Sequence, residues 1–186
     1  MPRKFYAGRT IDVARGLLGQ AIVHGELSGR IVEVEAYLPD YKGQPDLAAH
    51  SSRGITPRTR VIFGPPGHAY VYLIYGMYEC LNVVAEPEGI PGCVLIRALE
   101  PLESGGIDMS GPGKLTRALG ITRVHYGHDL LKAPLTIRSL GTPSEPIVVT
   151  PRIGIRHCAD WPLRFYLGGN RFVSGTVQQA RSDVLR

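Results

Sequence analysis

Apolar and polar residues alternate along residues 30–38 (RIVEVEAYL). Successive side chains of a strand point to opposite faces of the sheet. One face of this segment is apolar and consists of Val32, Val34, Ala36 and Leu38. The other face carries Ile31, Glu33, Glu35 and Tyr37. The pattern predicts a strand with a carboxylate-bearing face.

Six further runs are rich in strand-forming residues and are separated by turn residues, at 68–75, 79–86, 93–101, 134–139, 146–150 and 163–167. The first two are joined through Gly76-Met77, which predicts an antiparallel hairpin. The centre of the protein is therefore expected to be a sheet.

Two segments have the features of helices. Apolar residues recur at helical intervals over 11–18, with Asp12 near the start, where it complements the helix dipole. In the segment 110–121, Pro112 is suited to open a helix and Gly120 to close it. Residues 39–66 predict a long loop with one short helix. We expect one mixed α+β domain spanning 1–186, with no internal repeat.

Composition narrows the partners. The chain has 21 Lys and Arg against 16 Asp and Glu, a net charge of +5, and only four of the 21 are lysines. A guanidinium excess favours phosphate contacts, although a soluble surface alone would also explain it. Three dispersed cysteines disfavour a disulfide framework or a structural zinc site. With no apolar signal segment or membrane span, a cytoplasmic protein is expected.

Glu35 and Tyr37 lie two residues apart, so on a strand they project side by side. The ring could stack on a purine while the carboxylate takes a proton from water attacking the sugar's anomeric carbon. Glu33 shares this face and is a rival base. An ordinary exposed strand face is the simpler alternative.

Four of the nine tyrosines fall within the run YVYLIYGMY, at Tyr70, Tyr72, Tyr75 and Tyr78. Core packing would explain one or two of them. Tyr75, however, adjoins the predicted turn, where an exposed ring is typical of a wedge that fills the gap left by an extruded nucleotide.

Several motifs occur together and in order: GRIVEVEAYL, DLAAHSSRGITPRTR, YVYLIYGMYECLNV, VLIRALEP, SGPGKLTRALGI and PLRFYLGG. They span nearly the whole chain and resemble the alkyladenine (3-methyladenine) DNA glycosylase family. The resemblance implies a curved, mainly antiparallel sheet with a hairpin that enters the DNA minor groove. It also implies a monomer that excises damaged purines from double-stranded DNA, without metal or cofactor. The substrates would include 3-methyladenine, 7-methylguanine, hypoxanthine and ethenoadenine.

The resemblance also implies roles for individual residues. Glu35 becomes the general base in place of Glu33. The base pocket would comprise Tyr37, His50, Tyr72, Asn82 and Ile62, with Asn82 excluding the guanine amino group. Tyr75 would intercalate, with Met77 beside it in the minor groove.

Arg97 would hold a flanking phosphate and use its carbonyl to position water, with ion pairing to Glu35 or Glu100 as the alternative. Weaker candidates for phosphate contacts are Arg53, Arg58, Arg60, Lys114 and Arg117. The segment 104–110 is shorter than the corresponding family connection, and the residue type at Ile62 varies among relatives. These departures leave the range of lesions open.

Two other functions remain possible at this stage. Removal of Met1 would expose the amine of Pro2, which could form a Schiff base and support lyase chemistry. A damage sensor could use the same wedge without cleavage. The carboxylate of Glu35 favours a monofunctional hydrolase, acting in the cytoplasm on the nucleoid, or in the nucleus if the chain is eukaryotic.

Overall fold

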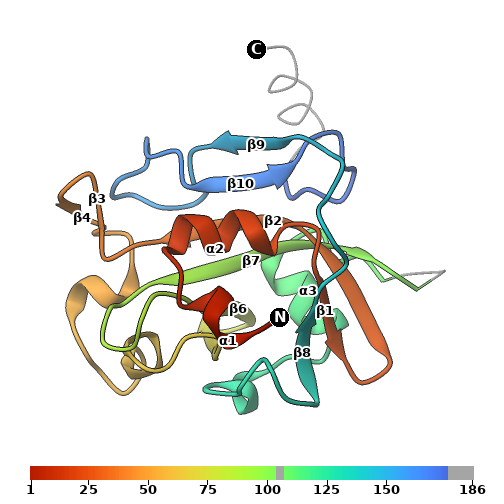
Figure 1. Ribbon diagram of the computed structural model, residues 1–186, viewed down its shortest axis with the longest axis horizontal. Coiled ribbons are helices and arrows are strands. Elements are labelled where there is room, and N and C mark those ends of the chain that lie inside the picture. The colour runs from red at the N-terminus through yellow and green to blue at the C-terminus, as the bar shows by residue number, and fades with distance from the viewer. Residues whose placement is uncertain (104–106, 176–186) are drawn as a thin grey trace.

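The sheet is assembled on β2 (Leu27–Tyr37), the longest strand (Figure 1). The computed structural model describes residues 1–103 and 107–175. One edge of β2 pairs with β7 (Cys93–Pro101). The other edge pairs first with β1 (Ala21–His24) and then with β10 (Arg164–Leu167). Two branches of the sheet therefore leave the same strand.

The remaining strands extend this arrangement. The hairpin of β5 (Ala69–Ile74) and β6 (Tyr78–Val84) continues from β7 to the sheet edge. On the other side, β8 (Leu135–Arg138) follows β1, and β9 (Ile147–Thr150) follows β10. All pairings are antiparallel and the sheet curls into a half-barrel, so the predicted α+β class and the predicted strands are confirmed.

The helices are few and short: α1 (Arg3–Tyr6), α2 (Thr10–Leu17) and α3 (Pro112–Ala118). The predictions for α2 and α3 are confirmed, with Pro112 in the first turn of α3 and Gly120 at a positive φ just beyond it. No helix in the described ranges is long and apolar enough to cross a membrane.

The loop predicted between residues 39 and 66 contains only short elements. These are the paired strands β3 (Asp40–Tyr41) and β4 (Gln44–Pro45), followed by the 3-10 turns η1 (His50–Arg53) and η2 (Arg60–Phe63). A third such turn, η3 (Arg123–His125), follows α3. Of the connection expected to be shortened, residues 104–106 lie outside the described ranges.

Both faces of β2 are buried. Val34 and Ala36 belong to the apolar core together with Val13 and Leu17 of α2. The opposite face carries Glu33 and Glu35, which are both 0% exposed. The expectation of an ordinary exposed strand face is therefore wrong. The register of β2 against β7 shifts on both sides of Glu33, as at a β-bulge.

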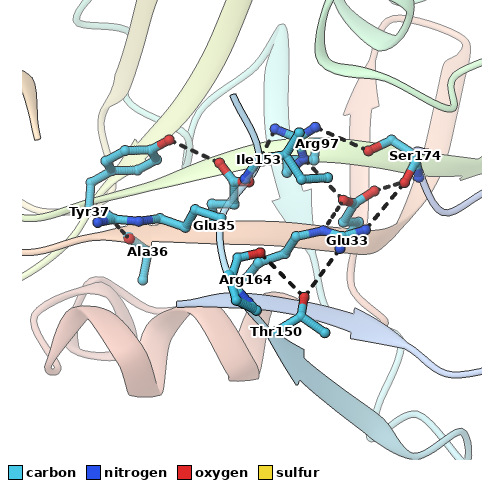
Figure 2. A network of polar contacts seen from close by, with 11 residues as sticks. Glu33, Glu35, Ala36, Tyr37, Arg97, Thr150, Ile153, Arg164 and Ser174 are labelled. Atoms are coloured by element: carbon cyan, nitrogen blue, oxygen red, sulfur yellow. Dashed lines mark hydrogen bonds and ion pairs between the residues drawn. The ribbon is translucent and has the colours of Figure 1, made fainter. Parts of the chain in front are cut away.

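Glu33 is neutralised by groups from three other segments (Figure 2). Its Oε1 accepts hydrogen bonds from Nε of Arg97 at 3.0 Å and from Nε of Arg164 at 2.7 Å. Its Oε2 accepts one from the backbone N–H of Ser174 at 2.6 Å. Both guanidinium groups also donate to Ser174: Arg97 to its Oγ and Arg164 to its carbonyl oxygen. Glu33 thereby ties β7, β10 and residue 174 to β2.

Replacing Glu33 should lower the free energy of unfolding more than replacing an exposed glutamate does. Glu33→Gln leaves two buried guanidinium groups without their shared anion, a change that costs about 3–5 kcal/mol. Glu88→Gln, at an exposed position, should stay within about 0.5 kcal/mol of the wild type. Urea unfolding followed by circular dichroism measures both, and equal midpoints for the two variants would contradict this role.

Candidate active site

Glu35 is fixed by two hydrogen bonds and one ion pair (Figure 2). The Tyr37 hydroxyl donates to Oε2 at 2.9 Å, and the backbone N–H of Ile153 donates to Oε1 at 2.7 Å. Nη1 of Arg97 lies 3.2 Å from Oε1. A carboxylate has about four lone-pair sites, so three donors leave room for one more, such as a water.

A cavity of about 490 Å³ is lined by the groups that hold this carboxylate. Three of its lining residues, Tyr37, Arg97 and Ile153, are the ones that contact Glu35. Neither Glu33 nor Glu35 is itself a lining residue, but all three partners of Glu35 line the cavity, whereas Arg97 alone does so among the partners Arg97, Arg164 and Ser174 of Glu33. The geometry therefore favours Glu35 over Glu33 as the carboxylate that acts on a molecule in the cavity.

Aromatic side chains form the cavity wall away from Glu35. His50 and Tyr72 meet edge to face with ring centroids 4.7 Å apart, and Tyr70 lies 5.3 Å from Tyr72. The Tyr70 hydroxyl and Nδ1 of His50 are 2.8 Å apart. With Tyr37, these rings give the cavity the flat apolar walls that suit a planar base, and Tyr37, His50 and Tyr72 line the same cavity.

His50 is a neutral imidazole at ordinary pH. Burial, and then the nearby charges of Arg58 and Arg53, lower its pKa to about 4. Burial, reinforced by the Glu35 carboxylate, also raises the pKa of the Tyr37 hydroxyl above its ordinary value. The two groups therefore serve as neutral hydrogen-bonding walls.

Tyr37 packs against the arginine of a buried ion pair. The Arg152 guanidinium lies 4.7 Å from the Tyr37 ring centroid and binds both carboxylate oxygens of Asp46, at 2.6 and 2.8 Å. Arg152 also donates to the carbonyl oxygen of Ala36. Local sequence patterns do not reveal five residues of this network, because their partners are over 100 residues distant in the chain: Asp46, Arg152, Ile153, Arg164 and Ser174.

The two remaining residues of the expected base pocket differ in position. Asn82 lines the cavity, where its Nδ2 donates to the carbonyl oxygen of Tyr70 at 3.0 Å. Ile62 does not line it: η2 turns this side chain inward, into a buried cluster with Tyr70 and Cys93. The expectation that Ile62 forms the wall is corrected, since it supports the aromatic wall from behind.

Tyr75 stands at the tip of the β5–β6 hairpin, at the rim of the cavity. It is 82% exposed and its φ is +53°, a conformation that costs a non-glycine residue about 1–2 kcal/mol. Met77, two residues on, is 65% exposed. The hairpin thus holds a large ring and an apolar chain out in solvent beside the cavity.

Arg97 differs from the expected phosphate contact. Its Nε binds Glu33, its Nη1 lies against Glu35 and its Nη2 binds Ser174, so the guanidinium is already engaged within the protein. The ion-pair alternative is therefore correct for Glu35 but not for Glu100, which pairs with Arg30.

The weaker phosphate candidates are all exposed: Arg53, Arg58, Arg60, Lys114 and Arg117. Lys114 lines the cavity and pairs with Asp108 at 2.7 Å, and Arg58 stacks over Tyr72. Pro2 is not among the lining residues of the cavity. Among the described residues, no group of three His, Cys, Asp or Glu is arranged to hold a metal ion.

Comparisons with known proteins agree on a family. The family model described as methylpurine-DNA glycosylase (MPG) matches residues 4–171. A protein of Methanoculleus marisnigri named "Putative 3-methyladenine DNA glycosylase" is 51% identical, over 94% of this chain and 98% of its own. A relative with the same name in Legionella pneumophila strain Corby is 50% identical, over 95% of this chain and 98% of its own. Another in Anaeromyxobacter dehalogenans strain 2CP-C is 47% identical, over 94% of this chain and 86% of its own.

The low pKa of His50 has a consequence for stability. Between about pH 6.5 and pH 4 the unfolded chain binds a proton that folded His50 does not, so acidification destabilises the native state. His50→Gln lacks this titrating group, so its free energy of unfolding should fall less than that of the wild type over this interval. With allowance for solvent screening of a half-buried group, the difference should be about 1–2 kcal/mol. Urea unfolding at pH 7, 5 and 4 tests this, with the exposed His157→Gln as control. Parallel stability curves for wild type and His50→Gln would refute it.

Proposed function

Because the chain belongs to the methylpurine-DNA glycosylase family, we propose that it flips damaged purines out of duplex DNA and hydrolyses their N-glycosidic bonds. The lesion class would comprise 3-methyladenine, 7-methylguanine, hypoxanthine and ethenoadenine. The observation that carries this proposal is the buried Glu35 carboxylate, whose partners Tyr37, Arg97 and Ile153 line a cavity with aromatic walls. We further propose that the protein acts as a monomer on chromosomal DNA, in the cytoplasm of a prokaryotic cell.

In this mechanism the extruded base enters between Tyr37 on one side and His50 and Tyr72 on the other. Glu35 takes a proton from a water molecule, whose oxygen attacks the anomeric carbon as the bond to the base breaks. The negative carboxylate also stabilises the oxocarbenium-like charge on the sugar. The products are a free base and an abasic site, and a positively charged alkylated base leaves without needing further protonation.

The three contacts of Glu35 support its role as the base. Arg97 and the N–H of Ile153 both contact Oε1 and hold the carboxylate in one orientation. Because Tyr37 is both a donor to Glu35 and a wall of the cavity, it links the position of the base to the position of the carboxylate. Asn82 at the wall supports exclusion of the guanine amino group.

Glu35→Gln tests the chemical step. The amide keeps the shape of the carboxylate but cannot accept the proton, so base release should fall by about 10²–10⁴-fold. Single-turnover release of hypoxanthine from a lesion duplex measures this rate, and a gel-shift assay should show that binding to the same duplex persists. Glu88→Gln, exposed and distant from these contacts, is the matched control.

Three results would overturn the proposal. A wild type that binds the duplex but releases no base would indicate a damage sensor. Undiminished release by Glu35→Gln would remove Glu35 from the chemistry. A covalent DNA adduct after borohydride trapping would indicate an amine nucleophile and a lyase step in place of water attack.

Tyr75 provides an independent test of intercalation. Tyr75→Gly relieves the positive φ, so the free energy of unfolding should rise by about 1 kcal/mol, while loss of the wedge should lower lesion excision at least about tenfold. Tyr75→Ala, which keeps the backbone strain, should lose excision without the gain in stability. Thermal unfolding and single-turnover excision measure the two effects, and full activity in either variant would refute the wedge.

A further inference from the structure

The ring of Tyr72 is a wall shared by two cavities. On one side is the aromatic cavity beside Glu35. On the other is a second, more open cavity of about 490 Å³, which is lined by Arg58, Arg60 and Arg123 and does not include His50 or Tyr37. Tyr72 is thus the one residue that the linings of the two cavities have in common.

Arg58 occupies this outer side. Its Cζ lies over the Tyr72 ring, 5.0 Å from the centroid, within the range of a cation–π contact. Its charge also contributes to lowering the pKa of His50 and opposes the rise in the pKa of Tyr70 that burial causes. Three aromatic groups that wall the first cavity therefore feel the field of Arg58.

We propose that Arg58 is a specificity-determining residue, which acts through Tyr72 to favour neutral purines over positively charged ones in the cavity. This inference rests on the proposed function, because it concerns the choice among lesions excised at that site. Arg58 does not line the cavity, so it is a positioning residue and not a catalytic one.

The physical basis is competition for one π-system. An aromatic ring attracts a cation through the negative potential of its faces. A guanidinium over Tyr72 already uses this potential and places a positive charge behind the ring. A base alkylated to a cation, such as 7-methylguanine, gains less from Tyr72 and is repelled by Arg58. A neutral base such as hypoxanthine carries no net charge to be repelled and stacks on the polarised ring.

This effect differs from that of a phosphate contact, which Arg58 could also make. A phosphate contact strengthens binding to every duplex, damaged or not. An effect transmitted through Tyr72 changes the ratio between cationic and neutral lesions. Arg60 lines the same outer cavity and is exposed, so its replacement removes a nearby charge while the contact of Arg58 with Tyr72 is kept.

The experiment compares Arg58→Met, Arg58→Lys and Arg60→Met with the wild type. Single-turnover excision is measured on duplexes with one 7-methylguanine or one hypoxanthine, and binding to both is measured in a Glu35→Gln background. Arg58→Met should raise the ratio of the 7-methylguanine excision rate to the hypoxanthine excision rate at least about threefold. Arg58→Lys, which retains the charge, and Arg60→Met should stay closer to the wild-type ratio.

An unchanged ratio in Arg58→Met would overturn the inference. So would equal losses on both lesions and on undamaged duplex, which would identify a phosphate contact only. If the wild type releases neither base, the proposed function fails, whereas the binding ratios in the Glu35→Gln background still decide the role of Arg58. Circular dichroism of each variant shows that the comparison is made on folded protein.

Discussion

Two buried carboxylates on one strand face, held by arginines, are the constraint on which the structure depends. Glu33 and Glu35 are fully buried, where an unpaired anion would be prohibitively costly. Arg97 reaches both, with Nε on Glu33 and Nη1 on Glu35. Because Arg97 comes from β7 and Arg164 from β10, neutralising the pair requires the strands on both edges of β2. The charges thus help to specify the branch point of the sheet.

The same arrangement gives the two carboxylates different roles. Two of the three partners of Glu33, Arg164 and Ser174, do not line the cavity, and the third, Arg97, is shared with Glu35. Two partners of Glu35, Tyr37 and Ile153, line the cavity. Glu33 therefore serves as an anchor for Arg97, and Arg97 in turn orients Glu35 toward the cavity. A rigid carboxylate beside a preformed cavity is the condition that hydrolysis at that point requires.

Local patterns in the sequence were sufficient for much of this structure. Alternation placed Glu35 and Tyr37 on one strand face, and Gly76 after Tyr75 identified the hairpin tip, because both features depend only on neighbouring residues. Alternation could not distinguish Glu35 from Glu33, nor show that their face is buried. That burial depends on β7, β10 and residues 150–153, which are brought there by chain reversals that no local pattern encodes.

The arginines illustrate the same limit and change the meaning of the net charge. Composition treats all the guanidinium groups as one basic surface, but Arg97, Arg152 and Arg164 are buried and engaged with Glu33, Glu35 or Asp46. They organise the site and are not exposed for a polyanion to contact. The exposed groups, including Arg53, Arg58 and Arg60, supply the field outside the cavity. Since the buried pairs cancel, the positive excess of the described residues is carried by groups outside the buried network, where it can attract DNA.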